Sequence, residues 1–119
     1  MADRRKGLRL MLRTEDVSFR VSGQPEPKLK DLKTRTQKVD QESGLPMWST
    51  ELTAQMSNGA QVIAVTTVSH VAPSVSIGEL VEPVDLEALP WTNTDANGQV
   101  RSGVAFKATD LRALVPAGV

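Results

Sequence analysis

The sequence contains no cysteine and no tyrosine, and it has only one histidine, two tryptophans and two phenylalanines. The lack of cysteine excludes disulfides and thiolate chemistry, so a zinc site would have to be built from His70 and carboxylates alone. No stretch of 18 apolar residues occurs, because arginines interrupt the apolar N-terminal segment GLRLMLR. We therefore expect a soluble, cytoplasmic protein with no membrane partner, no cofactor and no metal.

Residues that could carry a reaction are also scarce. His70 follows a segment with strand character, and a single histidine in that position is typical of a solvated surface residue. The carboxylates Glu79, Glu82, Asp85 and Glu87 have no histidine, cysteine or glycine-rich loop near them in the sequence, so they indicate a solvated acidic rim. There is no phosphate loop, nucleophile elbow or metal-ligand spacing. The sequence predicts a protein that is not an enzyme and has no catalytic residues.

The charge of the chain sums to zero but is unevenly distributed. Residues 1–40 contain eleven Lys and Arg against six Asp and Glu, so the remaining residues carry the opposite surplus. Such asymmetry is typical of a nucleic-acid or membrane contact through the basic part, and equally of a solubilising basic tail. The N-terminal residues 1–13 leave two alternatives open, a short basic amphipathic helix or a disordered segment.

Turn signals and short alternating runs predict strands rather than helices. Asn58-Gly59 is typical of a tight hairpin turn, and Asn97-Gly98 closes a loop. The segment 70–79 is a connection broken by Pro73 and Gly78. The expected strands cover residues 17–21, 32–39, 46–56, 61–69, 80–86, 89–91 and 100–108, the last of these ending the fold.

At 119 residues the chain is long enough for one domain with a modest core. A three-strand meander, a connection and a hairpin predict an all-β fold, a small antiparallel barrel of five to six strands of the OB type. An SH3-like barrel is the next candidate, and a β-sandwich would need more strands. The expected organisation is a basic N-terminal extension (1–14), the barrel (15–112) and a C-terminal tail (113–119).

Side-chain alternation predicts which residues face the core. In strand 46–56, Trp48 shares a face with Thr50, Leu52, Ala54 and Met56, so Trp48 is expected to be a core residue at the start of the strand, after a turn formed by residues 40–44. In strand 100–108 the even-numbered residues, from Val100 to Ala108, are expected to point inward. Strand 61–69 is apolar on both sides, as expected for a strand covered twice or used in a subunit contact.

Single-stranded nucleic acid is bound by cations that contact phosphates and by aromatic rings that stack on bases. Trp91 follows Pro90 at the mouth of a loop, where it is either a stacking platform or a partly buried lid over the barrel end. The predicted nucleic-acid-binding residues are Lys33, Arg35, Lys38, Trp91, Arg101 and Lys107.

Several short segments together resemble one protein family. They are QKVDQESGLPMW (37–48), VIAVT (62–66), GELV (78–81), LPW (89–91) and RSGVAFKA (101–108). This combination is similar to small actinobacterial proteins of integrative or conjugative plasmids and phages, which include plasmid replication, integration and excision activators. Ser43 stands where threonine is expected, which keeps the hydroxyl. The resemblance implies a role in the replication, transfer or maintenance of a mobile element, on an OB-like single-strand-binding frame.

We therefore expect an accessory protein that binds single-stranded DNA. One alternative is an adaptor that recruits a protein partner in replication or transfer through its acidic rim or basic tail. Another is a phage assembly protein. A homo-oligomer is compatible with each of these hypotheses.

Overall fold

The computed structural model describes residues 7–114, a range that contains strands, turns and loops but no helix, and hence no helix that could cross a membrane. The all-β prediction is confirmed. The strands are β1 (Leu10–Met11), β2 (Ser18–Val21), β3 (Glu26–Pro27), β4 (Leu29–Asp31), β5 (Thr36–Gln37), β6 (Met47–Met56), β7 (Gly59–Val68), β8 (Leu80–Val84), β9 (Glu87–Thr94), β10 (Val100–Lys107) and β11 (Asp110–Ala113).

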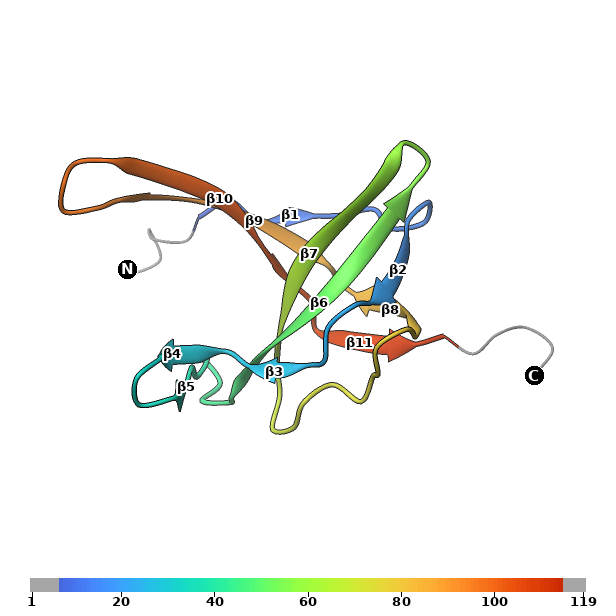
Figure 1. Cartoon of the computed structure of the whole chain (residues 1–119), viewed down its shortest axis with the longest axis horizontal. Coiled ribbons are helices and arrows are strands. Elements are labelled where there is room, and N and C mark those ends of the chain that lie inside the picture. Colours follow the sequence, from blue (N-terminus) through green and yellow to red (C-terminus); the bar gives the residue numbers. More distant parts are fainter. Residues whose placement is uncertain (1–6, 115–119) are drawn as a thin grey trace.

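Nine of the strands form one curled sheet, in the order β1-β9-β10-β7-β6-β2-β8-β11, with β3 paired to β6; β4 and β5 form a separate hairpin (Figure 1). Residues 7–114 form eleven strands, more than the five to six that were predicted. The prediction of a wholly antiparallel sheet is wrong, because β10 runs parallel to β7, with Phe106 opposite Val65. The sheet is therefore mixed, and it curls into a half-barrel around the core.

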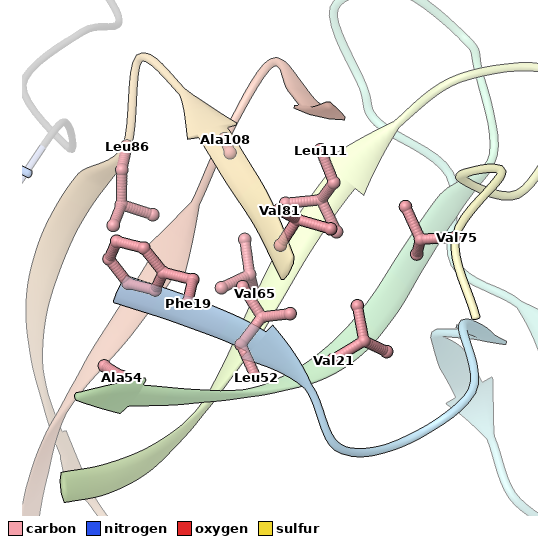
Figure 2. Packing of buried hydrophobic residues seen from close by; sticks show 10 residues of the cluster. All are labelled: Phe19, Val21, Leu52, Ala54, Val65, Val75, Val81, Leu86, Ala108 and Leu111. Atoms are coloured by element: carbon pink, nitrogen blue, oxygen red, sulfur yellow. The ribbon is translucent and has the colours of Figure 1, made fainter. Parts of the chain in front are cut away.

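The core lies inside this curl (Figure 2). Leu52 and Val65 are fully buried, and they pack with residues from β2, β8 and β11, including Phe19, Val81 and Leu111. On β6 the residues Thr50, Leu52 and Ala54 are buried while Glu51 and Gln55 are exposed, which confirms the predicted inward face. Trp48 lies half-buried at the end of that face, where its indole N–H donates to the Ser69 carbonyl at 2.9 Å.

The long hairpin β6–β7 forms as predicted, but its turn is placed one residue earlier. Met56 pairs with Gly59, so Ser57 and Asn58 make the two-residue loop, and Gly59 takes the positive φ of 140°. The turn before β6 is confirmed, since the Asp40 carbonyl accepts the Gly44 N–H at 2.8 Å and Gly44 has φ 76°. These turns fix where β6 starts and where β7 returns.

The predicted strand 32–39 is wrong, because residues 32–35 form the turn between β4 and β5 and only Thr36–Gln37 of the predicted range form a strand. The Asp31 carboxylate accepts the Lys33 N–H at 2.9 Å, and this local bond competes with strand pairing. Arg35 then takes a left-handed φ of 57°. The threonine-rich composition of this segment favoured a strand, but Asp31, which precedes it, stabilises a turn instead.

The two ends of the sheet also differ from expectation. β1 lies in the N-terminal extension and pairs with β9, Leu10 opposite Ala88, so the helical alternative is wrong for residues 7–13; residues 1–6 are outside the described range. At the other end, β11 follows β10 and pairs with β8, so β10 does not end the fold.

The hairpin of β9 and β10 extends beyond the core, and residues 89–105 of it are called the arm (Figure 1). Phe106 packs against the core and Ala108 belongs to it, as predicted for the inward face of β10. The same prediction is wrong for Val100 and Val104, which are 66% and 51% exposed because the arm has no core beneath it. The prediction that both faces of β7 are covered likewise holds only for Val65, Thr66 and Thr67, which are buried, while Val62 is exposed.

Candidate nucleic-acid interface

A surface groove of about 670 Å³ lies beside the β4–β5 hairpin. A second groove, of about 660 Å³, lies where β7 and β10 diverge. The second groove has residues of β7 on one side, including Val62 and Ala64, and Val104 and Ala105 of β10 on the other. Lys28 and Trp91 also line it. This groove therefore brings a cation and a large aromatic ring to one surface.

Lys28 is held in place by both its backbone and its side chain. It follows β3, its N–H donates to the Met47 carbonyl at 3.0 Å, and its ammonium donates to Thr66 Oγ1 at 2.9 Å. Burial lowers the pKa of Lys28, and the nearby charges of Lys38 and Lys107 lower it further. The positive charges of Lys38 and Lys107 thus act on the Lys28 ammonium, and an anion bound beside Lys28 would offset them.

Lys38 and Lys107 reach this cluster from different elements. The Lys38 N–H donates to the Lys28 carbonyl at 2.6 Å, which ties the end of the β4–β5 hairpin to Lys28. Lys107 pairs across strands with Thr66 on β7 and with Glu87 on β9. Glu87 is engaged by Arg9 at 2.9 Å, and Lys107 has no carboxylate within 4.0 Å in the described part of the chain. We call Lys28, Lys38 and Lys107 the lysine cluster.

Beside Lys107, the carboxylate of Asp40 has a defined local role. It accepts the Ser43 N–H at 3.0 Å and the Ser43 hydroxyl at 2.9 Å. These two hydrogen bonds hold the pKa of Asp40 below its usual value, with a smaller contribution from the charge of Lys107. The Asp40 carboxylate thus stabilises the turn before β6.

Trp91 is 45% exposed and lies directly across from Gly103 in the arm. A Cβ atom added to Gly103 would come within 2.7 Å of Trp91 Cζ2 and 3.0 Å of Cε2. The indole therefore lies on the bare backbone of Gly103, with part of its surface open to solvent. Trp91 is thus partly covered by the arm and partly exposed.

The structure gathers only part of the predicted set of binding residues. Lys38 and Lys107 belong to the lysine cluster, and Trp91 lines the same groove as Lys28. Lys33 and Arg35 lie in the turn of the β4–β5 hairpin, and Arg101 is exposed on the arm, so these three cations are placed on two projections.

Sequence reasoning missed Lys28, Thr66 and Gly103. A glycine inside a strand pattern often marks a close approach by another group, and that signal was present at Gly103. No sequence signal pointed to Lys28, because its position in the groove depends on the pairing of β3 with β6.

Three of the four carboxylates of the predicted acidic rim contact other residues of the chain. Glu79 accepts the Ser76 N–H at 2.7 Å, Glu82 lies 3.6 Å from Arg112, and Glu87 pairs with Arg9. His70 is exposed, as expected for a solvated residue, and residues 7–114 contain no cluster of three or more potential metal ligands.

The sequence matches no protein-family model, and it has no significant match among curated proteins.

Proposed function

We propose that the curled sheet is a barrel of the OB type whose groove between β7 and β10 binds single-stranded DNA. The pairing order supports the barrel: β2 pairs with β6, β6 with β7, β7 in parallel with β10, β10 with β9, and β8 with β2. β8 and β9 are consecutive and count as one bent strand, interrupted at Asp85, which has φ 52°. On this count the proposed barrel has five strands, and β1, β3, β4, β5 and β11 are additions to it.

In this frame, two connections correspond to the loops that flank the ligand in OB folds. The first connects β3 to β6 and carries Lys30, Lys33, Arg35 and Lys38. The second is the turn at residues 95–99 of the arm. The outer faces of β6 and β7 lie between them, as the strands that contact oligonucleotides do in this fold.

The observation that carries the proposal is that Lys28 and Trp91 line one groove, with Lys38 and Lys107 close to Lys28. Phosphates would lie against the lysine cluster, where each neutralised charge also relieves repulsion between the ammonium groups. A base would stack on the exposed face of Trp91, while the other face is occupied by Gly103. The two interactions together select a single strand, since stacking needs an unpaired base.

The proposed role is that of an accessory, non-enzymatic DNA-binding protein in the replication, transfer or maintenance of a mobile element. The family resemblance of the sequence supports this context, and the lysine cluster and Trp91 support the ligand. Partner recruitment through the acidic rim is less well supported, because Glu79, Glu82 and Glu87 already have local partners.

The test measures binding of fluorescently labelled oligo-dT by anisotropy at several salt concentrations. Trp91→Ala is expected to weaken binding about tenfold, since stacking contributes roughly 1–3 kcal/mol per base. Lys28→Gln/Lys107→Gln is expected to weaken binding and to reduce the salt slope by about 0.7 for each phosphate that the variant no longer neutralises.

Arg112→Gln serves as the matched control, because Arg112 is an exposed cation on β11 paired with Glu82, outside the groove. It should bind as the unaltered protein does. Absence of any anisotropy change for the folded protein at low salt, with protein at tens of micromolar, would overturn the proposal. Equal weakening by Arg112→Gln and by Lys28→Gln/Lys107→Gln would overturn the assigned groove.

A further inference from the structure

One edge of the arm is an unpaired strand edge. β10 pairs with β9 over its whole length, but it pairs with β7 only at Phe106 and Lys107. On the β7 side, residues 100–105 therefore have no strand beside them. Exposed edges of this kind are templates for pairing with another chain.

The hydrogen-bonding direction of each residue on that edge follows from one bond. The Ala108 N–H donates to the Thr66 carbonyl of β7 at 3.0 Å, so the backbone groups of Ala108 point toward β7. Successive residues in a strand point their N–H and C=O groups to opposite sides, and the β10–β9 register is continuous. Val100, Ser102 and Val104 therefore direct their backbone groups to the open edge.

The opposite edge of the arm is protected. The odd-numbered residues of β10 bond to β9 and are opposite odd-numbered residues there, so Pro90 and Thr92 direct their backbone groups outward on β9. Pro90 has no N–H to donate, and β1 already covers Glu87 and Ala88. The edge of β10, by contrast, contains no proline between Val100 and Lys107.

We propose that two copies of this chain associate through antiparallel pairing of their β10 edges, with Ser102 on the two-fold axis. This register places Val100 opposite Val104 of the second copy, and Val104 opposite Val100. All three residues that face the edge then form hydrogen-bonded pairs, and Phe106, which already pairs with β7, is left out. A register centred on Gly103 would place Val100 opposite Phe106 and conflict with β7.

The side chains also favour this register. Val100 and Val104 are the most exposed apolar residues of β10, and here they cover one another in two symmetric pairs. On the other face, Arg101 lies opposite Gly103 of the second copy, whose Trp91 ring lies over that glycine. A guanidinium beside a tryptophan face is a favourable contact. This contact uses the face of Trp91 on which a base would stack, so the dimer and a stacked base compete for that ring. The pairing joins two arms into one four-stranded sheet and leaves the lysine clusters at its two ends.

The absence of cysteine in the chain makes Ser102→Cys a direct test. Hydrogen-bonded antiparallel pairs have Cα atoms about 5.5 Å apart, so a short bifunctional thiol reagent can join two cysteines placed there. With such a reagent and in the absence of DNA, Ser102→Cys should form a cross-linked dimer as its main product. Thr92→Cys is the matched control, because Thr92 is opposite Ser102 on β9 and so one strand further from the axis. Equal cross-linking of the two variants, or none with Ser102→Cys, would overturn the proposal.

A charge exchange tests the register without cysteine. By sedimentation, Val100→Lys/Val104→Lys should raise the dimer dissociation constant at least tenfold, since lysines then face lysines. Val100→Lys/Val104→Glu should restore the dimer, because each lysine then faces a glutamate of the second copy. Val71→Lys, in the exposed β7–β8 connection, should leave association unchanged. A dimer equally stable in both β10 double variants, or a protein that stays monomeric at about 100 μM, would contradict the proposal, whether or not DNA binds.

Discussion

The close packing of Trp91 on Gly103 makes a sharp prediction for Gly103→Ala. The new Cβ would lie 2.7 Å from Trp91 Cζ2, a separation that non-bonded carbons do not adopt, so the indole has to move. Because the ring is 45% exposed, it can swing toward solvent rather than force the strands apart. The cost is therefore the weaker packing of the ring on the arm and not a distorted core.

The magnitude follows from the covered area of the ring. A tryptophan side chain buries up to about 250 Å², so the covered part of Trp91 is roughly half of that, corresponding to about 3 kcal/mol at ~25 cal/mol per Å². If half of this covered area becomes exposed, the cost is about 1.5 kcal/mol. Replacing a strand glycine by alanine returns about 0.5–1 kcal/mol. We expect a net destabilisation of about 0.5–1 kcal/mol, or a melting temperature lower by about 2–4 °C.

The assay combines thermal unfolding followed by circular dichroism with tryptophan emission and acrylamide quenching. Gly103→Ala should lower the melting temperature, shift the emission to the red and increase quenching. Gly7→Ala is the control, because its Cβ would meet only the Pro90 carbonyl at 3.9 Å, an ordinary van der Waals separation. The reasoning is refuted if Gly103→Ala has the same melting temperature as the unaltered protein and its tryptophan emission does not change.

Three further predictions concern the core and the charged groups. Thr50 and Thr67 have buried hydroxyls with no hydrogen-bond partner within residues 7–114, so Thr50→Val or Thr67→Val should stabilise the fold by about 1 kcal/mol in urea titrations; destabilisation would contradict this. Lys28→Met should raise the free energy of unfolding at neutral pH while weakening oligonucleotide binding. Because the pKa of Lys28 is lowered in the folded protein, the stability advantage of this variant over the unaltered protein should shrink as the pH rises through that pKa. A stability advantage that does not change at alkaline pH would contradict this. The lowered pKa of Asp40 contributes stability above the usual aspartate pKa that is lost as the pH falls through the folded value, so Asp40→Asn should flatten the acid limb of a plot of melting temperature against pH, and an unchanged limb would refute this.

The sequence determined the features that depend on neighbouring residues. Alternation in residues 46–56 correctly predicted that Thr50, Leu52 and Ala54 face the core, and glycine marked the turns at Gly44 and Gly59. These features follow from side-chain period and backbone preference, which act within a few residues. The turn at residues 31–35 was missed for a related local reason, since a single aspartate outweighed a run of strand-forming residues.

Only the tertiary structure decided which residues share a surface. Lys28, Lys38 and Lys107 come together because β3 pairs with β6 and β10 runs parallel to β7, and neither pairing is encoded in any one segment. The exposure of Val100 and Val104 was likewise undecided by alternation, because period two tells the side of a strand but not whether a core lies on that side. The sequence thus determined faces and turns, while the long-range pairing of strands determined the groove, its lining and the free edge of the arm.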